Sequence, residues 1–405
     1  MQTKATNSGT AEETAVKTLH VFIYDVASPH APTIASFSTD ANTLINSGNS
    51  WTASTPIRTL KADKYIFAGI NLTPAIINEI TSRGLGAFSY KEFEQSSSDL
   101  TNPPDGFVMF NTTYPAVTPG DALATSAEAA KANPISIPVS RVVAKAAVVK
   151  STSFVVNGGG TMQNITYGWR NINRRFYFIP KIDGGIIKDY NWDSYNVNDF
   201  VRGTDQIPVN EATATPTTFS YALENSFNYI PGSSLVDQTT FLSIQGQFLP
   251  TQICRIKTGV TAPQGATDFE FVNNPNGYGT FYVVRTDDGS SNYFITGTDA
   301  EKYAELCIAH APDMPALTGG YSLSDNIFTN GMCYFHVLVN SAASGHYGPY
   351  GIYRNQYYRM TLNSIQAPGN PNDNFDHNQV ISPNTWVDVN ITVDEWQEID
   401  EDCDL

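Results

Sequence analysis

The sequence has few of the residue patterns that mark enzymes and metal proteins. H-E-x-x-H, G-x-S-x-G, the P-loop and the dinucleotide glycine fingerprint are all absent, which argues against an enzyme. The cysteines stand far apart without a C-x-x-C pair, so neither a zinc site nor a disulfide framework is indicated, although one long-range bridge remains open. They are Cys254, Cys307, Cys333 and Cys403. We therefore expect no catalytic residues, no metal ligands and no cofactor.

Charge and long apolar runs are also scarce. Charged residues make up only 15% of the chain, yet acidic residues outnumber basic ones and give a net charge of -16. Because such a surface repels phosphate backbones, we expect no nucleic-acid partner. No apolar run approaches the roughly 18 to 20 residues of a membrane span. The start, residues 1–6, has neither an apolar signal core nor a lipid-acceptor Cys, so we expect a trimmed, mature form.

Turn formers and aromatic residues are plentiful instead. The chain holds 29 Gly, 23 Pro, 21 Tyr and 22 Phe among 405 residues, a composition typical of short strands joined by many turns. The length favours two domains, and the first strong break lies at residues 157–160. We expect a mainly β protein with a flexible leader (1–15), an N-terminal sandwich (16–150), a C-terminal sandwich (151–370), and a linker with a terminal strand (371–405).

Several stretches give local predictions. Residues 16–25 are apolar on both faces apart from His20, as in a strand covered on each side. Thr73, Pro74 and Gly84 carry the N-cap, first-turn and stop signals of a short helix, and a second helix is expected over residues 299–310. The small side chains at alternate positions after residue 141 allow close approach of another strand. They are Val142, Ala144, Ala146 and Val148.

The most regular pattern lies near the end of the sequence. Val387, Val389, Ile391 and Val393 alternate with polar residues, the period of a strand with one buried face. Turn residues precede this segment at 370–374 and 382–384 and separate it from earlier strands. It is either the last edge strand of its own sandwich or a strand offered to a neighbouring subunit by β-augmentation. Composition alone leaves both interpretations open.

The loop at residues 372–377 carries the oxygen ligands that Ca²⁺ prefers. It lacks the spaced Asp, central Gly and distal Glu of a defined calcium loop, so we expect a solvated turn. A second interpretation of the whole chain is a surface sandwich that binds glycan through aromatic side chains. Trp169, Trp192 and Tyr195 are the candidates.

Taken together, several stretches resemble the fimbrillin family, the type V pilins of Bacteroidia, and most closely its minor fimbrillin branch. Their order and spacing cover nearly the entire chain. They are residues 16–25, 138–146, 165–170 with 174–177, 240–250, 353–358 with 363–365, and 387–393 with Trp396 and 404–405.

The resemblance implies a fimbrial subunit made of two transthyretin-like sandwiches and exported as a lipoprotein precursor. A surface protease would remove the first N-terminal strand, here near Lys4, and leave a groove that the C-terminal strand of the next subunit fills. The implied donor residues are Val387, Val389, Ile391, Val393, Trp396 and Ile399. The implied groove residues are Leu19, Val21, Ile23, Val142, Ala144, Ala146 and Val148.

The resemblance also implies the partners of this chain. They are further copies of itself in a fibre on the outer membrane, with other fimbrial subunits at the tip and the anchor. Within the family a tip or anchor subunit is the alternative to a shaft subunit. Because shaft members carry a donor tail and tips generally lack one, the terminal strand favours the shaft.

Overall fold

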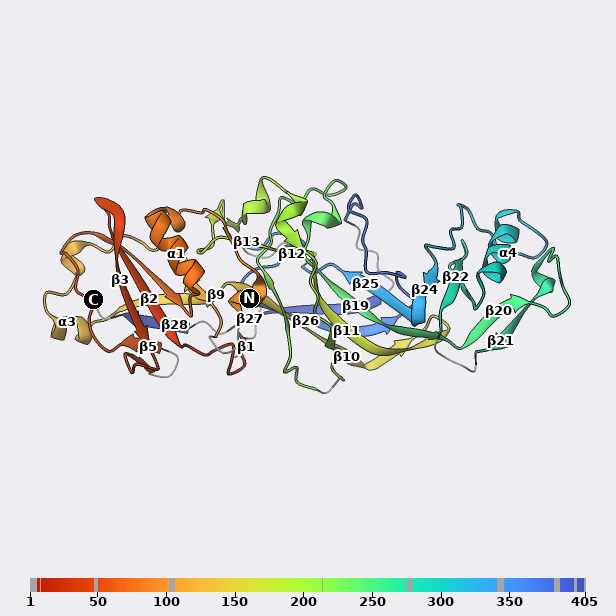
Figure 1. Ribbon diagram of the computed structural model, residues 1–405, viewed down its shortest axis with the longest axis horizontal. Coiled ribbons are helices and arrows are strands. Elements are labelled where there is room, and N and C mark those ends of the chain that lie inside the picture. Colours follow the sequence, from red (N-terminus) through yellow and green to blue (C-terminus); the bar gives the residue numbers. More distant parts are fainter. Residues whose placement is uncertain are drawn as a thin grey trace.

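The protein is elongated, with its sheets arranged one after another along the long axis (Figure 1). The computed structural model describes residues 6–7, 9–46, 50–101, 106–212, 214–274, 279–340, 346–381, 387–396 and 399–403. Strands dominate and the helices are few and short, which confirms the predicted mainly β class.

An eight-stranded sheet forms one end of the molecule, in the order β3-β2-β6-β8-β9-β28-β5-β4. Seven of its strands come from the first part of the chain, and the eighth, β28, comes from the last part. The strands are β2 (Thr18–Asp25), β3 (Ser28–Ser38), β4 (Leu44–Asn46), β5 (Ser50–Ala53), β6 (Lys64–Ile70), β8 (Met109–Asn111), β9 (Ile135–Arg141) and β28 (Ile399–Cys403).

The core of this end is built on the apolar strand β2 and an aromatic cluster. Phe67 stacks on Phe88 with ring centroids 4.0 Å apart. Helix α1 (Pro74–Arg83) begins where the Thr73 side chain accepts a hydrogen bond from the Ile76 amide and ends at Gly84, whose φ is 57°. These are the predicted start and stop residues, so this helix is confirmed.

The middle of the molecule is a two-layer sandwich. One layer has the order β1-β27-β26-β10-β18 and the other β17-β11-β19-β25. The small Ala144 and Ala146 of β10 leave room for the large, fully buried Tyr167 and Trp169 of β11 between the layers. The strands are β1 (Thr6–Asn7), β10 (Val143–Val156), β11 (Gly160–Arg170), β17 (Ile207–Pro208), β18 (Ser220–Leu223), β19 (Phe241–Pro250), β25 (Met332–Val337), β26 (Gln356–Ile365) and β27 (Val387–Trp396).

The chain passes from the first sheet to this sandwich at Val142, between β9 and β10. The domain boundary near residue 150 was placed there because of the glycine run at 157–160, and it stays a prediction. In the structure that run is the turn between β10 and β11.

An outer module lies at the opposite end of the long axis from the first sheet (Figure 1). It is inserted between β19 and β25 and has its own core, which includes Phe269, Phe294 and Tyr303. Its elements are β20 (Gln252–Ile256), β21 (Phe269–Asn273), β22 (Phe281–Arg285), β23 (Ser291–Phe294), α4 (Gly297–Ile308) and β24 (Ile327–Phe328). Helix α4 confirms the second predicted helix.

Short elements complete the fold. Strand β7 pairs with β13 and links a loop of the first end to the sandwich. The short elements are β7 (Phe93–Glu94), α2 (Ser97–Leu100), α3 (Ala127–Ala132), β12 (Ile172–Asn173), β13 (Arg175–Phe176), β14 (Ile182–Asp183), β15 (Ile186–Ile187) and β16 (Phe200–Val201).

Candidate functional site

Strand β28 occupies a slot in the N-terminal sheet. It pairs antiparallel with β9, where Ile399 lies opposite Val139 and Cys403 opposite Ile135. On its other edge it pairs parallel with β5, whose remaining neighbour is β4. The β4–β5 hairpin is therefore joined to the rest of this sheet through β28. Without β28, two strands would present unpaired backbone edges, a state that sheet proteins usually avoid.

The slot has one apolar side. Along β9, Ile137 and Val139 are buried while Ser136 and Pro138 are exposed. The register sets the odd-numbered residues of β28 opposite the apolar residues of β9 and sets Asp400 and Asp402 opposite the exposed ones. Within this pattern Glu401 lies opposite the buried Ile137.

Strand β27 lies on the sheet of the sandwich. It pairs antiparallel with β26, and its alternating residues Val387, Val389, Ile391 and Val393 lie opposite Ile365, Leu362, Met360 and Tyr358, all of which are buried. Among the described residues, its other edge pairs only with the two-residue β1, at Glu395 and Trp396. Of the predicted donor residues, the structure thus places five on β27 and Ile399 on β28.

The predicted groove residues are not brought together with the tail. Leu19, Val21 and Ile23 belong to β2, which lies between β3 and β6. Ala144, Ala146 and Val148 belong to β10, which lies between β18 and β26, and Val142 precedes β10. All seven are buried. Both edges of these two strands are already paired, so neither strand borders the position that β28 occupies between β9 and β5.

Sequence reasoning missed the slot strands, although β9 carries a signal. Residues 135–139 place the aliphatic residues Ile135, Ile137 and Val139 at alternate positions, and Pro138 stands within the strand. Because Pro has no backbone N–H to donate to a ladder, it is confined to edge strands and bulges. A proline in an alternating strand therefore points to an edge that needs a special partner.

The segment before β2 is fixed by a buried ionic cluster. Lys145 Nζ lies 2.9 Å from Glu13 Oε2, and the Tyr221 hydroxyl donates to Glu13 Oε1 over 2.9 Å. Arg141 Nε donates to the backbone carbonyl of Glu13 over 2.8 Å. Burial lowers the pKa of Lys145 to about 8, against the opposing attraction of Glu13.

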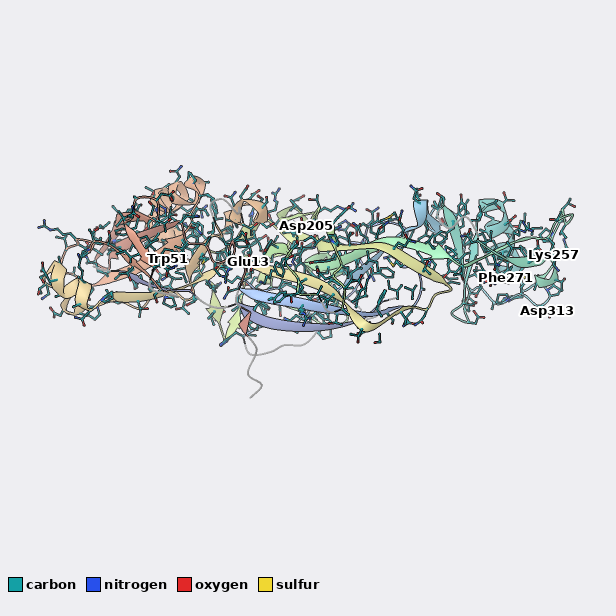
Figure 2. The ribbon with its side chains drawn as sticks, turned by 90° about the horizontal axis from the view of Figure 1, so that it is seen from below. Glu13, Trp51, Asp205, Lys257, Phe271 and Asp313 are labelled. Atoms are coloured by element: carbon teal, nitrogen blue, oxygen red, sulfur yellow. The ribbon has the colours of Figure 1, made fainter. Side chains whose placement is uncertain are left out.

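The predicted flexible leader over residues 1–15 does not anticipate this cluster. The Glu13 side chain is fully buried, and Figure 2 shows it near the junction of the two sheet systems, well apart from Trp51 in the N-terminal sheet. Lys4, the predicted processing position, lies outside the described residues.

A second buried cluster fixes the segment that leads to the tail. Asp373 accepts hydrogen bonds from Arg170 Nε at 2.6 Å and from the Ser243 hydroxyl at 2.6 Å, and its Oδ1 lies 3.1 Å from His336 Nε2. Burial alone would raise the pKa of Asp373, but the hydrogen bonds from His336, Ser243 and Arg170 outweigh it and hold the pKa well below its ordinary value. Farther along, the Ile381 amide donates to the Ser234 carbonyl.

The expectation of a solvated turn at residues 372–377 is therefore wrong for Asp373, whose side chain is buried by its ion pair with Arg170. Since its oxygens are occupied by protein donors, the loop is a structural anchor. In the part of the chain that the structure describes, no group of three or more His, Cys, Asp or Glu side chains is placed to hold a metal ion.

The predicted role of Trp169 in binding glycan is wrong. Its side chain is fully buried, its Nε1 donates to the Ser220 carbonyl over 3.1 Å, and it packs edge-on against Tyr358. Trp169 is thus a core residue. Trp192 and Tyr195 are half-buried, and Tyr195 packs against Phe200 with ring centroids 5.7 Å apart.

Comparison with known protein families gives a match over the strands just described. Residues 326–402 match the family model described as major fimbrial subunit protein type IV, fimbrillin, C-terminal. This region includes β26, β27 and most of β28. The protein is therefore a fimbrial subunit, a structural protein and not an enzyme. This match confirms the resemblance to the fimbrillin family over the C-terminal region of the chain.

Solved structures resemble the chain over almost its full length. A candidate cell adhesion protein from Parabacteroides distasonis is 14% identical, with 96% of each chain covered and a TM-score of 0.51. A second one from the same organism is 13% identical, with 98% of this chain and 94% of that chain covered and a TM-score of 0.48. The tip fimbrial protein Mfa3 from Porphyromonas gingivalis, with a C-terminal truncation, is 13% identical, with coverages of 96% and 98% and a TM-score of 0.41.

The first of these structures shows a shared fold. No curated protein matches the chain. Within the described residues, none of the helices combines the length and the apolar character that crossing a membrane requires.

Proposed function

We propose that the protein is a fimbrial shaft subunit that polymerises by donating its C-terminal strand region to the next copy. The observation that carries this proposal is the slot between β9 and β5, which β28, a strand from the end of the chain, fills. A slot of this kind can accept a strand from another copy in place of one from its own chain, because the same backbone ladders form in both cases.

The alternating segment of β27 suits the slot better than β28 does. Val387, Val389, Ile391 and Val393 place an apolar residue at every second position, whereas β28 places Glu401 opposite Ile137. Each fully buried side chain of this kind contributes roughly 1.5–3 kcal/mol. The slot also offers a partner strand on both edges, whereas β27 at home has a full partner only in β26 among the strands that the structure describes. We therefore assign β27 as the donor segment and β28 as the occupant of the slot in the isolated subunit.

The remaining parts of the proposal follow the family resemblance. The fibre serves adhesion at the cell surface and is attached to the outer membrane. The subunit is exported as a lipoprotein precursor and is trimmed near Lys4. Its partners are further copies along the shaft and other fimbrial subunits at the tip and the anchor.

A reversible lock on β28 tests the proposal. Cys403 lies opposite Ile135 in the antiparallel pair, where Cα atoms are about 4.5–5.5 Å apart, within the range of a disulfide. Ile135→Cys should therefore form a disulfide with Cys403 that holds β28 in its own slot. We expect the oxidised protein to remain monomeric under polymerising conditions and to form fibres once dithiothreitol is added.

The matched control combines Ile135→Cys with Cys403→Ser, which lacks the partner thiol and should polymerise with or without oxidant. Electron microscopy and size-exclusion chromatography give the readout, and mass spectrometry confirms the bond. Fibres of unchanged yield from fully oxidised Ile135→Cys protein would show that the slot need not open, and the proposal would fail.

A further inference from the structure

A cup lies between strand β16, with the residues next to it, and the loop at residues 373–377. Its volume is about 420 Å³, a size typical of small-molecule sites. Its floor is polar and buried, and includes Arg170, Asn171 and Asp373. Its rim is exposed and is formed by Val197, Val201, Arg202, Asn374 and His377. The lining thus combines apolar groups with hydrogen-bonding groups in one hollow.

The floor and rim carry an excess of positive charge, although the protein as a whole is acidic. Arg170 Nε lies 2.6 Å from Asp373 Oδ2, and Arg202 Nη2 lies 3.1 Å from the same oxygen. Two guanidinium groups therefore share one carboxylate. The side chain of Arg170 is 5% exposed, whereas that of Arg202 is 61% exposed. Because a guanidinium has several N–H donors in a planar fork, Arg202 can also bind the carboxylate of a ligand.

Apolar and aromatic groups line another part of the cup. Val197 and Val201 are 44% and 39% exposed, and the half-buried Phe375 belongs to the same lining. The His377 ring lies beside that of Phe375, with centroids 4.8 Å apart, and its Nδ1 lies 2.6 Å from Asp237 Oδ1. An apolar surface is thus bordered by polar side chains that are open to solvent.

Both walls of the cup are fixed by the fold. On one side β16 pairs with β12, where Val201 lies opposite Ile172. On the other side Phe375 packs edge-on against Phe241 with ring centroids 5.1 Å apart, and the Ser243 hydroxyl donates to Asp373 over 2.6 Å. A ligand therefore meets a site that is already formed, which lowers the entropy cost of binding.

We infer that this cup binds a sugar acid, that is, a pyranose ring that carries a carboxylate. The carboxylate pairs with Arg202, and the C–H face of the ring lies on Val197 and Val201. The hydroxyl groups bond to Asn374 and His377. A fatty acid would leave these polar groups without a ligand partner, and a phosphate would make no use of the valines. The cup shares no residue with the slot between β9 and β5, so the inference is independent of polymerisation.

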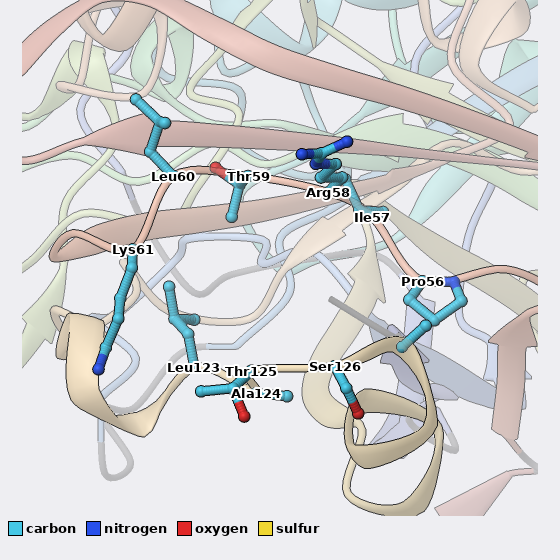
Figure 3. Close-up of a pocket in the computed structure, with 11 residues that line it drawn as sticks. Pro56, Ile57, Arg58, Thr59, Leu60, Lys61, Leu123, Ala124, Thr125 and Ser126 are labelled. Carbon is cyan, nitrogen blue, oxygen red and sulfur yellow. The ribbon is translucent and has the colours of Figure 1, made fainter.

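A larger hollow near the N-terminal sheet is a weaker candidate for such a ligand. Its volume is about 460 Å³, and residues 56–61 and 123–127 face each other across it (Figure 3). Its exposed Lys61 pairs with Asp121 at 3.0 Å. The buried members of its lining, Ile57 and Leu123, are both apolar, so its floor offers no buried polar group.

Matched ligands test the inference on the full-length protein. Glucuronate and glucose share one ring and differ only at the exocyclic carbon, which is a carboxylate in the first and a hydroxymethyl group in the second. Titration calorimetry and ligand-observed NMR should detect binding of glucuronate but not of glucose. Phenylacetate, a carboxylate on a flat ring without hydroxyl groups, should bind more weakly than glucuronate. Absence of glucuronate binding, or equal binding of glucuronate and either of the other two, would overturn the inference.

Two substitutions at exposed positions tie the binding to the cup. Arg202→Gln should weaken glucuronate binding about tenfold, because it removes a hydrogen bond between charged groups. Val197→Asp should also weaken it by placing a negative charge on the rim, and it leaves every partner of Asp373 in place. Arg58→Gln is the matched control with unchanged binding, because Arg58 is an exposed arginine of the larger hollow. Circular dichroism checks that each variant is folded. Wild-type affinity in folded Arg202→Gln and Val197→Asp would contradict the placement of the ligand.

Discussion

Glu13 and Lys145 stand 132 residues apart in the sequence, yet their side chains pair at 2.9 Å and neither is exposed to solvent. The pair joins the segment that precedes β2 to strand β10 of the sandwich. The start of the N-terminal sheet is thereby tied to the second sheet system, next to the place where β1 pairs with β27.

Breaking the pair of Glu13 and Lys145 should lower the free energy of unfolding. Glu13→Gln removes the negative charge that lies against Lys145 Nζ while the lysine stays buried, and loss of one partner of a buried pair typically costs about 3–5 kcal/mol. Urea unfolding should show a loss of this size. Glu12→Gln is the control, because the neighbouring Glu12 is exposed and should change the unfolding free energy by less than about 0.5 kcal/mol. Similar losses in both variants would argue against a special role of the pair.

The Asp373 cluster predicts that the free energy of unfolding depends on pH in the acid range. An aspartate in an unfolded chain has a pKa of about 3.9, whereas the pKa of Asp373 is lower in the folded protein. Its ionised form therefore stabilises the fold above about pH 4, and this contribution is lost as the pH falls below that value. The difference in unfolding free energy between the wild type and Asp373→Asn should be largest near pH 7 and shrink between about pH 4 and pH 2.

Asp376→Asn is the matched substitution for that experiment, since Asp376 is exposed in the same loop. Its unfolding free energy should follow that of the wild type at every pH. A constant gap between the wild type and Asp373→Asn over the whole acid range would contradict the linkage.

Two truncations should separate the roles of β27 and β28. Removing residues 397–405 empties the slot but keeps the alternating segment, so we expect faster polymerisation than in the wild type. Removing residues 382–405 also takes away the donor segment, so we expect soluble subunits without fibres. Light scattering gives the rates and electron microscopy the products. Fibres from the shorter protein would assign polymerisation to another surface.

A close backbone contact predicts that replacing Gly203 in the sandwich lowers the free energy of unfolding. A Cβ atom at Gly203 would overlap the Trp169 carbonyl oxygen, whereas one at Gly320 would meet no atom within 4 Å. Gly203→Ala should therefore lower the unfolding free energy by about 1–3 kcal/mol through overpacking, and Gly320→Ala should leave it nearly unchanged. Thermal unfolding of the two variants, followed by circular dichroism, provides the comparison.

Local features of the fold could be predicted from the sequence, because short-range chemistry decides them. The limits of helix α1 follow from Thr73, Pro74 and Gly84, and the strand character of residues 18–25 and 387–396 follows from their apolar pattern. Strand partners depend on contacts between distant residues, which a period of two does not encode. This is why the groove residues predicted from the sequence fall on β2 and β10, whereas β28 lies between β9 and β5, and why the burial of Glu13 could not be predicted.

The outer module leaves the sandwich after β19 and returns at β25, and these strands are neighbours with Gln247 opposite Met332. Its entry and exit therefore sit side by side, with an independent core between them. Evolution can enlarge, trim or replace such an insertion without disturbing the ladders around it.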